Sequence, residues 1–200
     1  LGLMAHLAAR GLAVPRPLRR RDGGYLGRIE GKPAAIVTYL QGQSVYRLRP
    51  RHCGRLGAAL AEFHEAARDH GAARANDYGP AGWHRLFEAV QDRADAVMPG
   101  LADELARDLE AIDRDWPDAL PAGIIHGDLF PDNVFFDREE NRITGLIDFY
   151  FAANDFLAYD LAICLNAWCF EDSRSFNISK ARHLATAYHA RRPLTAGELA

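Results

Sequence analysis

The chain has 200 residues, of which 48% are hydrophobic, and a formal net charge of -3. This composition predicts one or two globular domains with a packed core, and it excludes a disordered or collagen-like chain. Because Lys and Arg are not in excess, we expect neither nucleic acid nor an anionic membrane as a partner. The longest apolar run, 161–170, is far shorter than the roughly 20 residues that cross a bilayer, so it is expected to form a buried helix.

Three cysteines, Cys53, Cys164 and Cys169, show neither a CxxC pair nor a neighbouring histidine cluster. This odd set argues against a disulfide framework and against a zinc site. We therefore expect reduced thiols in a cytoplasmic protein. We expect no signal peptide from this sequence, because it shows no n-region and h-region, although a truncated start would hide one.

The first 40 residues combine one helix with a small sheet. Residues 1–10 have a helical pattern, which Gly11 and the prolines at 15 and 17 end. Turn signals at 22–24 and 30–33 then separate three segments, 17–21, 25–29 and 34–39. The simplest interpretation is an antiparallel meander of three strands.

A linker at 41–44 marks the expected domain boundary, and helices dominate after it. Apolar residues recur at helical spacing in 51–69 and again in 101–115, which predicts two amphipathic helices. The chain starts inside one helical pattern and stops at the start of another, so we expect both units, 1–40 and 41–200, to be incomplete.

Three short β-type runs interrupt the helical region, at 124–125, 134–136 and 143–147, with a hairpin connection at 137–141. Asp128 and Asn133 bracket the loop between the first two runs, and Asp148 directly follows the third. Loops at strand ends can hold carboxylates in place and leave them reachable. Mg²⁺ binds through one or two such oxygen ligands together with substrate phosphates, which suits Asn133 and Asp148, whereas Asp128 is free to accept a proton.

The spacing of these residues matches the phosphoryl-transfer pattern, in which a catalytic Asp precedes a metal-binding Asn by five residues and a second metal-binding Asp follows a hairpin. The loop HGDLFPDN, 126–133, resembles the catalytic loop of the protein-kinase-like fold. Its His-Gly-Asp form, with Gly127 where protein kinases have Arg, is that of the aminoglycoside phosphotransferase and choline kinase superfamily.

Nearly the whole chain is similar to bacterial homoserine kinases of the phosphotransferase type. The segment EGKPAAIVTYLQG, 30–42, shares this resemblance, and the block LIDFYFAANDFLAYDLAICLNAWCFE, 146–171, is specific to that branch. The resemblance implies an α+β, two-lobed protein-kinase-like fold. Residues 1–40 would be the end of the small ATP-binding lobe, and residues 41–200 most of the helical large lobe.

The resemblance also implies that ATP and Mg²⁺ are used to phosphorylate the hydroxyl of L-homoserine, which gives O-phosphohomoserine on the route to threonine. ATP would lie between the lobes, with adenine bound by main-chain groups of a hinge at 38–42, namely Thr38, Tyr39 and Leu40.

Each candidate site residue has a competing structural interpretation. Asp128 is expected to accept the proton of the substrate hydroxyl, but a loop Asp can also form an Asx-turn. Asn133 and Asp148 are expected to bind Mg²⁺, the alternative being caps at strand ends. His126 is expected to lie under the loop and hydrogen-bond to the backbone near Asp148, rather than act as a second base.

Two further carboxylates lie in the specific block. Asp160 is expected to brace the catalytic loop by accepting main-chain N–H bonds, or to cap the apolar helix that follows it. Asp155 is a candidate for holding the ammonium group of an amino-acid substrate, the alternative being an ordinary surface carboxylate.

One departure from the kinase pattern concerns the lysine that binds the ATP phosphates. The chain contains only Lys32, in a turn, and Lys180, deep in the helical region. We expect the phosphate-binding lysine to precede Leu1, in which case these 200 residues alone bind ATP poorly. The alternatives are a kinase of the same fold for an aminoglycoside, choline or a sugar, a catalytically silent nucleotide-binding module, and a metal-dependent hydrolase using His126 and Asp128.

Overall fold

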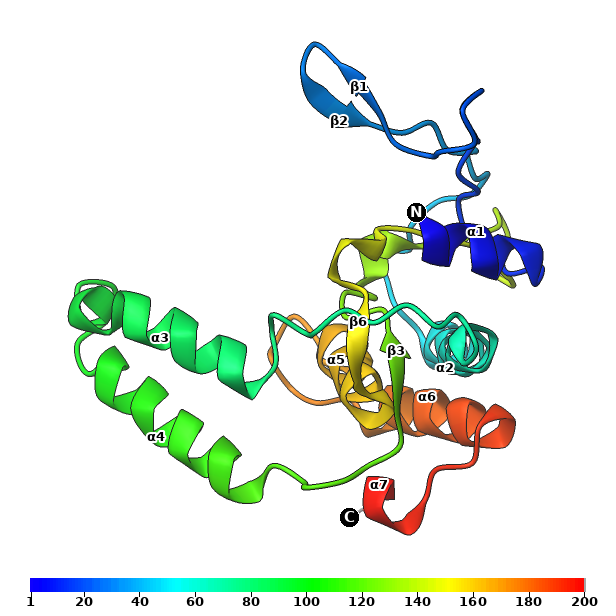
Figure 1. Cartoon of the computed structure of the whole chain (residues 1–200). Coiled ribbons are helices and arrows are strands. Elements are labelled where there is room, and N and C mark those ends of the chain that lie inside the picture. Colours follow the sequence, from blue (N-terminus) through cyan, green and yellow to red (C-terminus); the bar gives the residue numbers. More distant parts are fainter. Residues whose placement is uncertain (200) are drawn as a thin grey trace.

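The computed structural model describes residues 1–199, and Figure 1 shows how their helices and strands are arranged. The helices are α1 (Gly2–Ala9), α2 (Pro50–Ala67), α3 (Pro80–Ala94), α4 (Leu101–Asp115), α5 (Leu157–Cys169), α6 (Ile178–Arg191) and α7 (Ala196–Leu199), with short 3₁₀ turns η1 (Pro131–Asn133) and η2 (Phe149–Phe151). The strands are β1 (Gly27–Ile29), β2 (Lys32–Ala34), β3 (Ala122–Ile125), β4 (Val134–Phe136), β5 (Ile143–Leu146) and β6 (Ala153–Phe156).

β1 and β2 form an antiparallel hairpin that stands away from the helices (Figure 1). Its two-residue turn, Glu30 and Gly31, has φ of 48° and 78°, and this left-handed pair matches the twist of a tight hairpin. The predicted three-stranded meander is wrong in its first and third strands, because β2 lies at Lys32–Ala34, partly inside the predicted turn, and not at 34–39. Segment 17–21 makes only a single bridge, Pro17 to Val37, because the chain turns back on itself at 20–24, where the N–H of Arg20 donates to the oxygen of Gly24.

Two further antiparallel pairs frame the polar loop. β4 pairs with β5 across the predicted hairpin, with an irregularity between Phe135 and Phe136. β3 pairs with β6, whose sequence, Ala-Asn-Asp-Phe, has no β-branched residue and gave no strand signal. Pairing with β3 therefore produces β6, and this pairing sets the segment after Asp148 beside the segment before Asp128.

The core lies between α2, α5 and α6 and the inner faces of β3, β4 and β5. α2 packs along α6 at very short range: a Cβ on Gly57 would lie 2.1 Å from the carbonyl oxygen of Leu184. The predicted amphipathic helices at 51–69 and 101–115 are confirmed, with shifts of one or two residues at the ends of the first. The three cysteines are buried and free.

α3 and α4 form a helical hairpin that projects from the rest of the chain (Figure 1). No α4 residue is buried, and Trp116 at its end packs edge-on against Trp83 of α3. None of the helices in residues 1–199 is long and apolar enough to span a membrane.

Candidate active site

The loop that follows β3 carries Asp128 on a fixed backbone. Gly127 has φ of 75°, and a Cβ at this position would lie 3.0 Å from the carbonyl oxygen of Phe151. Only glycine adopts this conformation without strain, and only glycine lets the loop at Gly127 approach the backbone of Phe151 so closely. Pro131 then starts η1, whose last residue is Asn133, so the loop returns at once into β4.

Asn133 joins the two ends of this loop. Its Nδ2 donates to the main-chain oxygen of Asp128 at 2.8 Å and to the carboxylate Oδ2 of Asp128 at 3.1 Å. The amide is thereby oriented with its nitrogen toward Asp128, and its oxygen, Oδ1, remains an acceptor. The pKa of Asp128 is raised, first by burial and then by the negative charge of Asp148.

Asp148 follows β5 with φ of 64°, a left-handed conformation that is uncommon outside glycine. Its Oδ1 accepts a hydrogen bond from the main-chain N–H of Tyr150 at 3.4 Å, which starts η2. No Lys, Arg or His within residues 1–199 forms an ion pair with Asp128 or Asp148. Two uncompensated carboxylates beside a free amide oxygen are a donor set that fits a divalent cation such as Mg²⁺.

The side chains of Asp160 and His126 hold the catalytic loop in place through hydrogen bonds to the main chain. The Asp160 carboxylate accepts the main-chain N–H groups of His126 at 2.7 Å and Gly127 at 3.0 Å, which is the bracing contact predicted from the sequence. The alternative, an N-cap, is wrong: α5 begins at Leu157, so Asp160 lies within the first turn, and the capping position is Phe156. Burial tends to raise the pKa of Asp160, but the hydrogen bonds from the His64 ring and from the main chain of His126 lower it on balance.

His126 is fully buried and its Nε2 donates to the main-chain oxygen of Ile147 at 3.0 Å, the contact predicted for it next to Asp148. Burial lowers its pKa, so the imidazole is neutral with its proton on Nε2. Its Nδ1 is buried without a partner among the described residues. A neutral ring turned toward the backbone positions the loop and is poorly placed to act as a base.

His64, whose helical position predicts a core or boundary residue, also belongs to this support. It is buried in α2 and its Nε2 lies 3.0 Å from Oδ2 of Asp160. The signal was present in the sequence, because position 64 follows Leu60 by four residues and so shares its buried face. Only the position of Asp160 shows what that buried histidine contacts.

The expected hinge is extended backbone. The N–H of Thr38 donates to the oxygen of Arg16 at 2.9 Å, so only the carbonyl of Thr38 is available to a ligand. Within residues 1–199, the N–H and C=O groups of Tyr39 and Leu40 have no main-chain partner. Leu40 packs closely against Gly145 of β5, which anchors this segment to the larger unit.

Asp155 lies in β6 and is partly buried. Its Oδ2 accepts from Nδ2 of Asn76 at 2.7 Å, and its Oδ1 accepts from the N–H of Phe156 at 2.7 Å. No cationic side chain pairs with it in the described part of the chain. The segment 74–79 thus lies along β6, with Tyr78 edge-on against Phe151 beside the catalytic loop.

Both lysines lie away from these groups. Lys180 is buried at the start of α6 and forms an ion pair with Glu171 at 2.9 Å, and Lys32 is exposed in β2. Neither is recorded as a partner of Asp128, Asn133 or Asp148 in residues 1–199.

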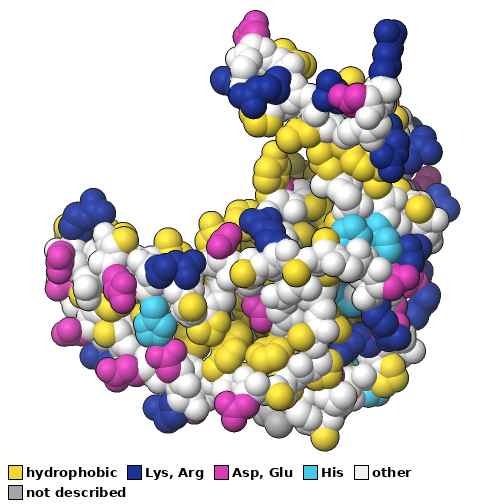
Figure 2. All heavy atoms as spheres, in the orientation of Figure 1, with side chains coloured by type: hydrophobic (Ala, Val, Ile, Leu, Met, Phe, Trp, Pro, Cys, Tyr) yellow, Lys and Arg dark blue, Asp and Glu magenta, His cyan; other side chains and the backbone are white. Residues whose placement is uncertain are grey.

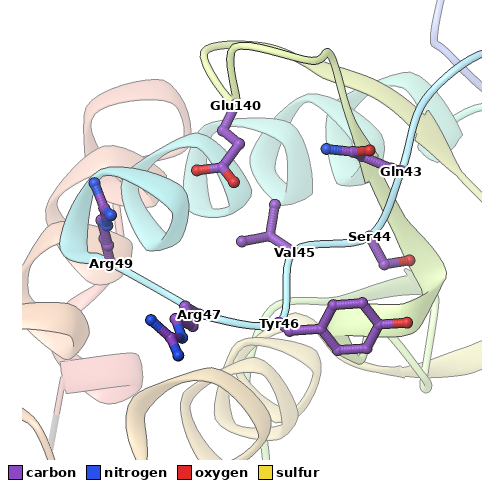
Figure 3. A pocket seen from close by; sticks show the side chains of 7 residues that line it. All are labelled: Gln43, Ser44, Val45, Tyr46, Arg47, Arg49 and Glu140. Atoms are coloured by element: carbon purple, nitrogen blue, oxygen red, sulfur yellow. The ribbon is translucent and has the colours of Figure 1, made fainter.

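The molecule is hollowed between the β1–β2 hairpin and α3, with hydrophobic side chains gathered beneath the hairpin (Figure 2). A separate hollow of about 500 Å³ follows the hinge, and Figure 3 shows the side chains that line it, Gln43, Ser44, Val45, Tyr46, Arg47, Arg49 and Glu140. Asp128, Asn133 and Asp148 do not line it. The Ser44 hydroxyl donates to the oxygen of Asp132, which connects this linker to the loop.

Comparison with known proteins agrees with this geometry. Over all 200 residues the chain is 53% identical to a homoserine kinase of Xanthobacter autotrophicus, covering 62% of that protein. A homoserine kinase of Parvibaculum lavamentivorans is 56% identical over 199 residues, and the chain covers 61% of it. The chain thus spans about three fifths of the length of these curated relatives.

Solved structures share the fold. An aminoglycoside-3'-phosphotransferase of type VIII superposes with a TM-score of 0.68 at 20% identity, over 98% of this chain and 74% of that one. The amicoumacin kinase hAmiN, solved with AMP-PNP and Ca²⁺, superposes with a TM-score of 0.72 at 17% identity, over 100% and 64%. The predicted α+β, protein-kinase-like fold is confirmed.

The family described as "Phosphotransferase enzyme family" matches residues 1–194, which include the catalytic loop, the hairpin and Asp160. With the geometry above, this match places the chain in the phosphotransferase enzyme family.

Proposed function

We propose that the whole protein is an ATP-dependent homoserine kinase, which forms O-phosphohomoserine on the way to threonine. One observation carries the chemistry: Asp128, Asn133 and Asp148 converge from three elements, with the Asn133 amide bonded to Asp128. The substrate class follows from the relatives at 53% and 56% identity that are named homoserine kinase. The free, buried thiols favour a cytoplasmic location.

In the proposed reaction, the hydroxyl oxygen of homoserine forms a bond to the γ-phosphorus of ATP, and the bond from that phosphorus to the bridging oxygen breaks to release ADP. Asp128 orients the hydroxyl and takes its proton. Burial, the larger cause of its raised pKa, makes it a better proton acceptor than an exposed Asp. Because the transition state is loose, orientation contributes more than basicity.

Asn133, through Oδ1, and Asp148 would hold Mg²⁺, which neutralises phosphate charge when bound. Replacing either residue by Ala should raise the Mg²⁺ concentration for half-maximal rate by about tenfold or more, because one of few protein ligands is lost. The Mg²⁺ titration should not change in Asp132→Ala, the neighbouring exposed-loop control. If Asn133→Ala and Asp148→Ala titrate like the wild type, they are not ligands.

For adenine, we propose the main-chain groups of Tyr39 and Leu40 together with the carbonyl of Thr38. The unpaired N–H and C=O groups of the first two support this assignment. Leu40→Pro removes one N–H and should weaken ATP binding in calorimetry, whereas Tyr39→Ala, which keeps every main-chain group, should bind ATP nearly as well as the wild type.

For the acceptor, we propose that Asp155 binds the ammonium group of the amino acid. It is partly buried, lies opposite Gly123 on the strand that pairs with β3, and has no cationic partner among residues 1–199. Asp155→Asn should raise the KM for homoserine and leave the KM for ATP within about twofold. Asp77→Asn, an exposed carboxylate in the neighbouring segment, is the matched control. Equal effects on both KM values would show that Asp155 only supports the fold.

The proposed function is tested by ADP release from ATP and Mg²⁺, measured on the whole protein with L-homoserine, kanamycin or choline as the acceptor. Homoserine-dependent ADP in the wild type and its near absence in Asp128→Asn are expected. ADP release with kanamycin or choline alone would give the same fold a different substrate. Release without any acceptor, equal in both proteins, would leave a nucleotide-binding module without this activity.

A further inference from the structure

A row of buried polar side chains runs from the end of the described chain to the catalytic loop. It crosses α7, α6, α2 and α5, of which α2, α5 and α6 pack against one another (Figure 1). Its members, in order, are Glu198, Arg192, Tyr188, His64 and Asp160. Buried polar groups are costly unless each has a partner, so the direction of every hydrogen bond in this row can be worked out.

Arg192 sets the direction, because a guanidinium group only donates. Its Nη1 donates to Oε1 of Glu198 at 2.8 Å and to the hydroxyl oxygen of Tyr188 at 3.0 Å. The hydroxyl of Tyr188 must then donate its own proton to an acceptor other than Arg192. The other partner recorded for it is Nδ1 of His64, at 2.8 Å.

His64 is consequently a neutral ring with its proton on Nε2. Nδ1 accepts the hydroxyl proton of Tyr188, and Nε2 donates to Oδ2 of Asp160 at 3.0 Å. A doubly protonated ring would donate from both nitrogens. Because Arg192 already donates to the same hydroxyl, the buried proton of Tyr188 would then have no acceptor among the described residues, and this arrangement is unfavourable.

Three N–H groups therefore converge on the Asp160 carboxylate: the side chain of His64 and the main chain of His126 and Gly127. Asp160 and the ring of His64 are fully buried, so each lost donor leaves charge poorly compensated. The two main-chain donors belong to the residues directly before Asp128. The position of Asp128 thus depends on the orientation of His64.

We propose that Tyr188 is a positioning residue for Asp128: its hydroxyl, oriented by Arg192, fixes the tautomer of His64 and through Asp160 the backbone of the catalytic loop. Glu198 holds Arg192 and also accepts from the N–H and hydroxyl of Thr195, so α7 takes part in this support. The kinetic consequence rests on the proposed function, whereas the tautomer and the loop backbone can be measured without it.

The first test needs no substitution. In ¹⁵N NMR of the histidine rings, His64 of the wild-type protein should show a protonated Nε2 and an unprotonated, hydrogen-bonded Nδ1. A proton on Nδ1 would overturn the proposal, because Tyr188 could not then donate to it.

The second test compares Tyr188→Phe with Leu184→Val. Both residues are buried on α6 one turn apart, but Leu184 takes no part in the hydrogen bonds, so its variant measures the effect of weaker packing alone. Tyr188→Phe should shift the Nδ1 signal of His64 and speed amide hydrogen exchange of Gly127 by about tenfold beyond its change in global stability. Leu184→Val should change global stability only.

The third test uses steady-state kinetics of the whole protein. Tyr188→Phe should lower kcat by about tenfold, which corresponds to about 1.4 kcal/mol, and leave both KM values within about twofold. Arg192→Lys, which keeps a donor for the hydroxyl, should retain more activity than Arg192→Met. If Tyr188→Phe matches Leu184→Val in Gly127 exchange, in the His64 signal and in kcat, Tyr188 only fills space. A wild type inactive toward homoserine would refute the proposed function, and the NMR and exchange results would still decide the role of Tyr188.

Discussion

Replacing Gly127 by Ala should damage both the stability and the activity of the protein, and the structure indicates by how much. At φ of 75° an L-residue with a Cβ is strained by about 1–2 kcal/mol. The new Cβ would also lie 3.0 Å from the carbonyl oxygen of Phe151, so the loop or η2 must move by a few tenths of an ångström. We expect a total loss of about 2–3 kcal/mol in the free energy of unfolding.

Gly71→Ala is the matched control, because Gly71 has φ of 72° and no atom within 4 Å of the added Cβ. It should lose only the backbone strain, and kcat should not change. Denaturant unfolding and initial rates of phosphoryl transfer measure both effects. In Gly127→Ala the displaced loop moves Asp128, so kcat should fall about tenfold or more. If the two variants lose equal stability and both keep wild-type kcat, the close approach of Gly127 to Phe151 does not position the loop.

Two further predictions concern packing and pH. In α2, Gly57→Ala should lower the free energy of unfolding by about 3 kcal/mol or more, because its Cβ would lie 2.1 Å from the Leu184 oxygen. Gly54→Ala, the control, should raise the free energy of unfolding by up to about 1 kcal/mol, since the nearest atom to its Cβ is 3.7 Å away. Equal effects in thermal unfolding would contradict the α2–α6 packing. Burial lowers the pKa of His126 from its ordinary 6.5, so the unfolded chain takes up this proton first and stability should fall as pH drops below about 6.5, by at most about 1.4 kcal/mol per pH unit. The lowered pKa of Asp160 adds a second loss of stability below about pH 3.8. Urea unfolding of the wild type and of His126→Asn at several pH values measures the first effect: near pH 6, the free energy of unfolding should depend less steeply on pH in the variant.

Local patterns were enough to predict most helices and the hairpin that carries the site. Leu101 and Leu105 start a helical repeat that the structure shows as α4, and the run at 134–136 is β4 without a shift. The contacts of His126 with Ile147 and of Asp160 with the loop were also predictable, because the resemblance placed both residues next to Asp128.

The rest depends on contacts between distant segments. β6 has poor strand propensity and forms only because β3 lies beside it. The contact between His64 and Tyr188 joins residues 124 positions apart, and no local pattern encodes such a pair. The first strand of the meander fails because the chain turns back on itself at 20–24, where the N–H of Arg20 donates to the oxygen of Gly24.

The proposed function requires this site to transfer the γ-phosphoryl group of ATP to the hydroxyl of homoserine, with Asp128 as the proton acceptor. The most direct measurement is ³¹P NMR of the whole protein incubated with ATP, Mg²⁺ and L-homoserine, in parallel with Asp128→Asn. A phosphate monoester signal that couples to the side-chain CH₂ of homoserine should appear with the wild type and be reduced by orders of magnitude with the variant. ADP and inorganic phosphate without that ester, or an equal yield of ester from both proteins, would contradict the proposed function.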